Sequence, residues 1–311
     1  MTDVKTMQTQ KITTNLWFDH QAEEAVKFYT SIFKNSETLE LTRFGKEGHE
    51  IHGKAEGTVM TISFQLEGQE FVALNGGPQF KFTPSVSFFI YCESRAEVDS
   101  LWRELSDEGF VMMPLQQYPF SEYYGWVQDK YGVSWQLILA DQAEIKQKIV
   151  PCLLFVGDQA GKVEEAMQFY TSVFEQAEIK EISRYEKGQD PNMEGAINYA
   201  AFRLNGQEFK AMDSYLEHGF TFNEATSFII HCKDQEEVDY YWNTLAEGGD
   251  EKAQACGWLK DKYGLSWQVV PTILHELLSA PDSSKSQNVT RALLQMKKLD
   301  VAALKQAYEQ A

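Results

Sequence analysis

Residues 124–136 read YGWVQDKYGVSWQ, and residues 256–268 read CGWLKDKYGLSWQ. Two other stretches recur in the same order. EEAVKFYTSIF (23–33) returns as EEAMQFYTSVF (164–174), and EVDSLWREL (97–105) returns as EVDYYWNTL (237–245). Matches that run through most of each half indicate a duplicated domain, because a solenoid would repeat at a much shorter period. The sequence therefore predicts one domain at 11–141, a second at 148–271 and a tail at 272–311.

Composition narrows the class of protein. The chain has 311 residues and a formal net charge of −18. Such an acidic surface disfavours nucleic-acid binding, because phosphate groups repel it. No apolar run reaches the length of a membrane span, and the first residues lack the apolar segment of a signal peptide. Four cysteines in a chain of this length favour reduced thiols and a cytoplasmic location.

The order of elements is the same in both repeats. In the first, a β-rich run (11–18) precedes an amphipathic helix (21–33), and three strand-like runs follow (38–44, 57–66, 70–77). The series then recurs as a strand (85–92), a helix (95–109) and three strands (110–115, 125–129, 134–139). Each repeat thus consists of two βαβββ modules. In the second repeat GGDEKAQACG replaces GFVMMPLQQYPFSEYYG, so its sixth strand is almost lost.

These motifs together are similar to those of a known family. LWFDHQAEEAVKFYTSIF, GQEFVALNGG, EVDSLWREL and GWVQDKYGVSWQ resemble the PhnB-like branch of the vicinal oxygen chelate (glyoxalase/bleomycin resistance) superfamily, often labelled 3-demethylubiquinone-9 3-methyltransferase. The resemblance implies an α+β fold in which two βαβββ modules form a cup-shaped, mostly antiparallel sheet with helices outside. It also implies paired domains, so we expect an intrachain pseudo-dimer, with a homodimer as a further possibility.

Metal-dependent members of that superfamily carry His or Glu on the first, fifth and eighth strands. The corresponding positions here are Thr13 or Thr14, Ser87 and Gln136 in the first repeat. In the second repeat they are Val150 or Pro151, Ser227 and Gln268. Divalent transition metals need His, Cys or carboxylate ligands. We therefore expect no metal and no cofactor.

The expected function is binding of a small apolar or aromatic molecule in the cup. Aromatic residues at the rim of the first cup provide apolar area and stacking faces, and we expect this cup to be the better binder. The candidate ligand-binding residues are Ser87, Tyr118, Phe120, Tyr124, Trp126 and Gln136 in the first repeat and Ser227, His231, Trp258 and Gln268 in the second. For Trp126 and Trp258, packing and ligand contact both remain open, whereas Trp135 and Trp267 are expected to pack in the core.

Two alternatives remain open. The chain could be a superfamily enzyme (isomerase, lyase or dioxygenase) that uses other side chains. Candidates are the turn residues Asp129 and Asp261, the strand residues Arg43 and Arg184, and the pair Asn75 and Asp213. A scaffold for protein contacts is the second alternative. A Rossmann-type methyltransferase is disfavoured, because no glycine-rich turn follows the first strand.

Three minor features complete the pattern. Cys256 has no neighbouring His to activate it, and His49 and His52 are expected in a polar loop.

In the tail, 272–280 and 288–299 are expected to form helices joined by a linker (281–287). Asp300 is the expected N-cap of a third helix. The tail should pack on a repeat or on another subunit.

Overall fold

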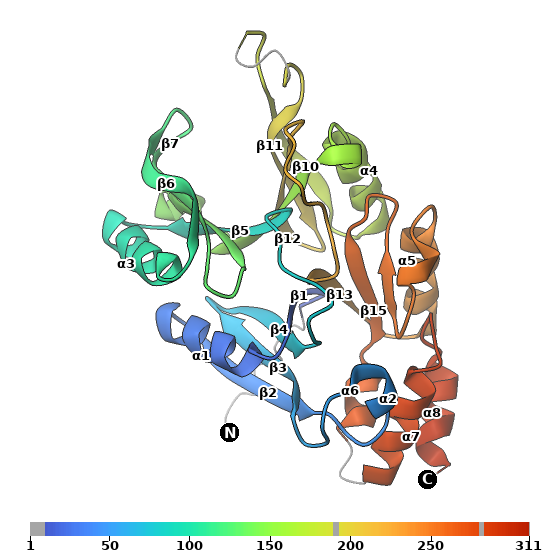
Figure 1. Ribbon diagram of the computed structural model, residues 1–311. Coiled ribbons are helices and arrows are strands. Elements are labelled where there is room, and N and C mark those ends of the chain that lie inside the picture. The colour runs from blue at the N-terminus through green and yellow to red at the C-terminus, as the bar shows by residue number, and fades with distance from the viewer. Residues whose placement is uncertain (1–9, 189–192, 280–282, 311) are drawn as a thin grey trace, which may run out of the picture.

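The computed structural model describes residues 10–188, 193–279 and 283–310, and its strands form two mixed sheets (Figure 1). Sheet A has the strand order β14-β15-β13-β1-β4-β3-β2, and sheet B has the order β10-β11-β12-β9-β5-β8-β7-β6. The strands from the first repeat are β1 (Ile12–Phe18), β2 (Glu37–Arg43), β3 (Val59–Leu66), β4 (Gln69–Asn75), β5 (Val86–Cys92), β6 (Phe110–Tyr118), β7 (Ser121–Gln128) and β8 (Ser134–Leu139). Those from the second repeat are β9 (Ile149–Phe155), β10 (Glu178–Arg184), β11 (Ile197–Leu204), β12 (Gln207–Asp213), β13 (Thr226–Cys232), β14 (Trp258–Lys260) and β15 (Ser266–Pro271).

The helices follow the predicted order, except that residues 49–52, expected to be a loop, form an additional short helix. They are α1 (Ala22–Ile32), α2 (His49–His52), α3 (Arg95–Ser106), α4 (Val163–Val173), α5 (Gln235–Ala246), α6 (Ile273–Leu278), α7 (Ser283–Leu293) and α8 (Val301–Glu309), with short 3-10 turns η1 (Gln142–Glu144), η2 (Gly157–Gln159) and η3 (Glu251–Ala253). The place of a sixth strand in the second repeat is taken by η3. The predicted α+β fold is confirmed.

Each sheet combines one module from each repeat. Strand β1 pairs with β13, and β5 pairs with β9, in both cases antiparallel. The expectation that each cup lies within a single repeat is therefore wrong. The connection between β8 and β9 is short, and it brings β9 alongside β5 in the same sheet. The two repeats are therefore joined by main-chain hydrogen bonds along two strand pairs.

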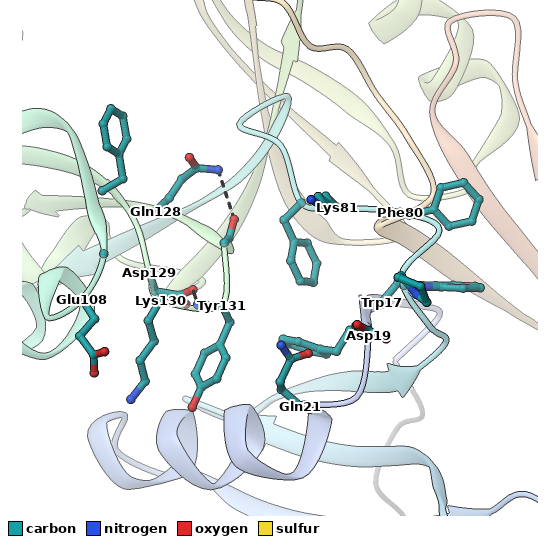
Figure 2. A pocket seen from close by; sticks show the side chains of 16 residues that line it. Trp17, Asp19, Gln21, Phe80, Lys81, Glu108, Gln128, Asp129, Lys130 and Tyr131 are labelled. Carbon is teal, nitrogen blue, oxygen red and sulfur yellow. Dashed lines mark hydrogen bonds between the residues drawn. The ribbon is translucent and has the colours of Figure 1, made fainter. Parts of the chain in front are cut away.

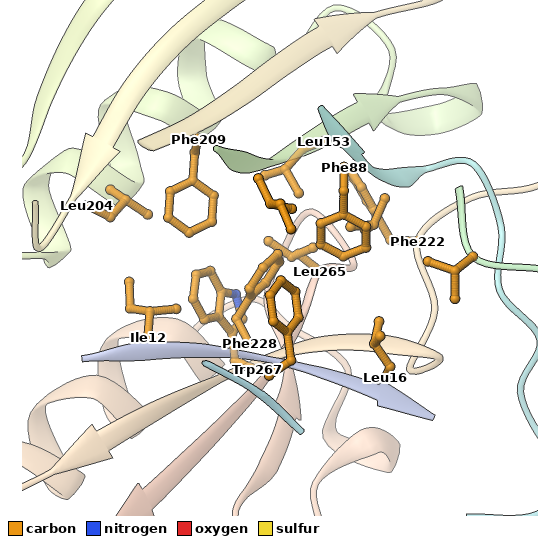
Figure 3. Packing of buried hydrophobic residues seen from close by; sticks show 14 of the residues in the cluster. Ile12, Leu16, Phe88, Leu153, Leu204, Phe209, Phe222, Phe228, Leu265 and Trp267 are labelled. Atoms are coloured by element: carbon orange, nitrogen blue, oxygen red, sulfur yellow. The ribbon is translucent and has the colours of Figure 1, made fainter. Parts of the chain in front are cut away.

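The hydrophobic core lies between the two sheets (Figure 3). Phe228 of β13 and Trp267 of β15, from sheet A, meet Phe209 of β12 and Leu153 of β9, from sheet B. Buried side chains of α1, α3, α4 and α5 belong to the same cluster. We call the opposite face of each sheet, turned away from this core, its outer face.

The duplicated motif connects a helix, a turn and a strand within each repeat. Asp129 is buried, and its carboxylate accepts hydrogen bonds from the Tyr29 hydroxyl (2.7 Å) and from Trp135 Nε1 (2.8 Å). It also accepts from the backbone N–H groups of Tyr131 (2.9 Å) and Val133 (3.0 Å). The motif thus links α1, the DKYG turn and β8 around one carboxylate.

The second repeat contains the same arrangement. Asp261 accepts from the Tyr170 hydroxyl at 2.7 Å and from Trp267 Nε1 at 2.9 Å. Each tryptophan packs edge-on or tilted against the tyrosine that shares its carboxylate. The twin aspartates, tyrosines and tryptophans therefore hold the fold together, which explains why one chain carries the motif twice.

Candidate functional site

The outer face of sheet B carries a buried polar cluster formed by strands of both repeats. Ser87 of β5 lies opposite Cys152 of β9 in the strand register. Gln136 of β8 donates from Nε2 to Ser87 Oγ at 2.7 Å and accepts from the Tyr124 hydroxyl at 2.5 Å. Ser87, Gln136, Cys152 and Tyr124 are all at most 3% exposed. We call these four residues the polar floor.

Sheet A has an equivalent set on its outer face. Gln268 donates from Nε2 to Ser227 Oγ at 3.0 Å, and Asn15 donates from Nδ2 to the same oxygen at 3.3 Å. Asn15 therefore occupies the place that Cys152 has in sheet B. The predicted first-strand positions, Thr13 or Thr14 in one repeat and Val150 or Pro151 in the other, lie at least one residue before Asn15 and Cys152 and are corrected by the strand register.

These donor sets do not fit a divalent metal. Asn15, Ser227 and Gln268 offer only neutral amide and hydroxyl groups. In sheet B, burial raises the pKa of the Cys152 thiol to about 12, so the thiol stays protonated at neutral pH. The Gln136 amide nitrogen, a hydrogen-bond donor, is the atom that faces Ser87. Within the described ranges no cluster of three or more His, Cys, Asp or Glu side chains could hold a metal.

Apolar side chains surround the polar floor of sheet B. Phe89, Tyr124, Val150 and Cys152 form a buried cluster. Partly buried side chains pack against it, namely those of Tyr91, Met113, Tyr118, Trp126, Ile138 and Met212. Tyr118 and Phe120 stack on each other at a centroid distance of 5.5 Å and meet the Tyr124 ring edge-on. The outer face of sheet B is therefore aromatic and methionine-rich, with part of this surface exposed to solvent.

The predicted site residues thus separate into two groups. Ser87, Tyr118, Phe120, Tyr124, Trp126 and Gln136 come together on sheet B, and Ser227, His231, Trp258 and Gln268 come together on sheet A. Trp126 Nε1 donates to Ser134 Oγ at 2.7 Å. His231 Nε2 lies 3.0 Å from Thr13 Oγ1, and burial lowers the pKa of His231 to about 4.

The C-terminal tail packs over one end of the outer face of sheet A (Figure 1). Val270 of β15, on this face, packs into a cluster with buried Leu274, Leu277, Val289 and Leu299 of the tail. At one edge of the sheet, the backbone N–H groups of Cys256 and Gly257 donate to the carbonyls of Met296 (2.7 Å) and Lys297 (2.8 Å).

The tail also reaches the opposite edge of sheet A. His275 lies 3.1 Å from Glu40 of β2, and Arg291 pairs with Glu47 at 2.7 Å. Figure 1 shows α2 beside α6 and α7 at this end of the molecule. Helix α6 therefore reaches from β15 to β2 at one end of the outer face, and α7 pairs with the loop before α2, whereas sheet B receives no such cover from the described tail residues.

The remaining candidates have structural contacts. Asn75 Oδ1 accepts from the Ala22 N–H at 2.9 Å, and Asp213 Oδ1 accepts from the Gly161 N–H at 2.7 Å, so both hold the start of a helix. Arg43 donates to the Gly57 carbonyl, and Arg184 pairs with Glu164 at 2.6 Å. Each of these four residues therefore has a structural contact of its own.

The structure also places His49, His52 and Cys256. His49 and His52 are the ends of the short helix α2 rather than members of an irregular loop, and the His52 ring lies 4.5 Å from the Phe44 ring. Burial raises the pKa of the Cys256 thiol, and its backbone N–H is bonded to the tail.

A separate cavity of about 560 Å³ lies at the end of β1 in the first repeat (Figure 2). Trp17, Phe80 and Tyr131 line it together with Lys81 and Lys130. Asp129 also borders this cavity, but both of its oxygens are already occupied by four donors from within the fold. No local sequence pattern predicts this cavity, because its walls come from segments that are far apart in the chain.

Comparison with known proteins places the chain in a family. The family model described as 3-demethylubiquinone-9 3-methyltransferase matches residues 10–138 and again residues 147–270. The chain belongs to this family. It contains two tandem copies, and the PhnB-like resemblance read from its motifs is confirmed.

Several solved structures are similar to this chain. The PhnB protein from Bacillus cereus is 46% identical over 42% of this chain and 100% of its own, with a TM-score of 0.39. A protein from Staphylococcus aureus is 39% identical over 43% of this chain and 98% of its own, with a TM-score of 0.19. Glyoxalase I from Zea mays covers 84% of this chain and 93% of its own at 10% identity, with a TM-score of 0.52, and so shares the fold. No curated protein matches the sequence.

In the part of the chain that the structure describes, no helix is both long enough and apolar enough to cross a membrane.

Proposed function

We propose that the protein binds a small, largely apolar molecule on the outer face of sheet B, without a metal. One observation carries the proposal: two equivalent faces exist, and the tail packs only over that of sheet A. The face of sheet B keeps Tyr91, Met113, Trp126 and Met212 partly exposed. Exposed aromatic and methionine side chains beside a few convergent polar groups are typical of small-molecule sites.

The polar floor gives such a site its orientation. Tyr124, Gln136 and Ser87 form a chain of hydrogen bonds beneath the apolar side chains. A ligand oxygen or nitrogen could exchange with these bonds, while a ring packs against Trp126. Groups that are already hydrogen-bonded to one another need little rearrangement to hold a ligand.

Binding is favoured over catalysis by the protonation state of the site. The Cys152 thiol has its pKa raised to about 12 by burial, and a thiol in this state is a poor nucleophile. Burial also raises the pKa of Tyr124 above its usual value. Neither group is then available for proton transfer near pH 7, because general acid–base catalysis needs a pKa near the working pH.

Substitution of two aromatic residues at the rim of this face tests the proposed binding site. Phe120 is 63% exposed and Tyr118 is partly exposed, so replacing both with Ala should leave folding intact. We expect the Tyr118→Ala/Phe120→Ala variant to bind planar aromatic compounds at least about tenfold more weakly in calorimetry, because two stacking faces are lost. Tyr240→Ala, at a 48% exposed aromatic on helix α5, which packs on sheet A, is the matched control.

Two results would contradict the proposal. One is unchanged affinity in the double variant. The other is loss of binding on substitution of Trp258, which lies on the outer face of sheet A, with no loss on substitution of Trp126.

A further inference from the structure

Lys210 is a buried lysine on the outer face of sheet B. It lies on β12, opposite Cys152 of β9 in the strand register, and only 8% of its surface is exposed. Its neighbour Phe209 points into the core between the sheets. Because side chains alternate along a strand, Lys210 points to the outer face, beside the polar floor. No other lysine in the described ranges is buried to this degree.

Lys210 has no anionic partner among the described residues. Its Nζ lies 4.9 Å from the centre of the Tyr199 ring and 5.9 Å from that of Tyr91. Glu208 is the acidic residue closest to it on the same strand face, but that carboxylate already binds Lys180 at 2.6 Å and Arg203 at 2.7 Å. Two aromatic faces are weak substitutes for a carboxylate.

Other poorly exposed lysines in this protein behave differently. The Lys148 side chain is 14% exposed and pairs with Glu97 at 2.8 Å. The Lys260 side chain is 21% exposed and pairs with Glu224 at 3.0 Å. Buried charges are ordinarily paired, because removal of an ion from water is costly. The missing partner of Lys210 is therefore an exception that needs an explanation.

The equivalent position in sheet A carries no charge. Val72 of β4 lies opposite Asn15 there, as Lys210 lies opposite Cys152 in sheet B. The face that the tail covers thus has valine, and the face left uncovered has lysine. A charged residue on one face and an apolar residue on the other is the difference expected if only the face of sheet B binds a ligand.

We propose that Lys210 recognises a negative charge, so that the ligand of sheet B is a small aromatic molecule bearing one carboxylate. This inference rests on the proposed function and specifies its ligand class. The carboxylate would pair with the Lys210 ammonium between the Tyr91 and Tyr199 rings, and the aromatic body would pack towards Trp126 and Met212. A single uncommitted cation matches a single negative charge, whereas phosphate groups usually need several cationic donors.

The test compares an acid with its neutral counterpart. We would titrate 2-naphthoate and 2-naphthamide into the full chain by calorimetry at low salt. We expect the acid to bind at least about tenfold more tightly, equivalent to ~1.4 kcal/mol. In Lys210→Met, which keeps the length of the side chain, this preference should disappear while the amide affinity stays within about twofold. Lys210→Arg should restore most of the preference, and Lys233→Met, at a 72% exposed lysine side chain, should leave both affinities unchanged.

A second readout is the stability of the free protein. Because the Lys210 ammonium has no anionic partner among the described residues, the urea midpoint of Lys210→Met should equal or exceed that of the wild type. A lower midpoint would mean that the ammonium serves the fold, which overturns the proposal. Equal binding of acid and amide to the wild type overturns the carboxylate inference and leaves small-molecule binding standing. Absence of binding by either compound and by neutral planar aromatics overturns both.

Discussion

Asp129 gives the sharpest prediction, because its carboxylate is buried and its pKa is displaced in a known direction. Burial raises the pKa of Asp129 from 3.8 to about 6, although four hydrogen-bond donors oppose the change. A folded-state pKa above the unfolded one means that the folded chain holds this proton more tightly. The associated stability is therefore fully present below pH 3.8 and is lost as the pH rises through 6.

The magnitude follows from the size of this displacement. A change of about 2 pKa units corresponds to ~3 kcal/mol of unfolding free energy. Asparagine at this position has no such titration. The stability of the wild type minus that of Asp129→Asn should thus fall by up to ~3 kcal/mol between pH 4 and pH 7, whatever the cost of the altered hydrogen bonds.

Urea unfolding of both proteins at intervals of pH measures this difference. Asp261→Asn should behave in the same way, because burial raises the pKa of Asp261 to about 6 as well. Asp158→Asn, at an exposed residue, is the control and should give a flat difference. A difference for Asp129→Asn that is flat or increases with pH would refute the reasoning.

Two further predictions concern sheet A. Burial lowers the pKa of His231 from 6.5 to about 4, so the pH dependence has the opposite sign. The stability of the wild type minus that of His231→Gln should fall by at most ~3 kcal/mol on acidification from pH 6.5 to pH 4. A rise in this difference would contradict the prediction. Leu299→Ala removes a fully buried tail side chain that lies against Gly257, and should cost ~2–5 kcal/mol of local stability. Amide exchange should then accelerate at Cys256 and Gly257, whose acceptors lie in the tail, and unchanged exchange there would show that the tail does not hold this edge.

The order of helices and strands could be predicted because it depends on local periodicity. The helix at 22–32 has apolar residues at helical spacing, and the strand at 134–139 alternates, with Trp135 in the core and Gln136 on the outer face. Asp300 caps α8 as expected, with its side chain accepting from the Ala303 N–H. These features need no knowledge of distant contacts.

Other features were hidden for physical reasons. All seven residues of β9 are buried, so IVPCLLF shows no alternation from which Cys152 could be assigned to the outer face. The exchange of modules between repeats leaves the element order unchanged, so no local pattern could show it. The polar segment 283–287 was expected to be a linker but begins helix α7, which is held by buried Val289. Residues 281 and 282 of that expected linker lie outside the described residues.

The inequivalence of the two faces follows from a single difference between the repeats. In sheet B the hairpin β6–β7 supplies both an edge strand and the aromatic rim, with Met113 paired to Trp126. The second repeat lacks the counterpart of β6, which would leave the edge next to Trp258 with unpaired main-chain groups. The carbonyls of Met296 and Lys297 now accept from that edge, and the helices beside them cover the face. The tail thus both binds the free edge of sheet A and packs over the outer face of that sheet. In sheet B the hairpin β6–β7 already forms the edge. Its outer face therefore retains the exposed aromatic rim and the lysine without an anionic partner among the described residues.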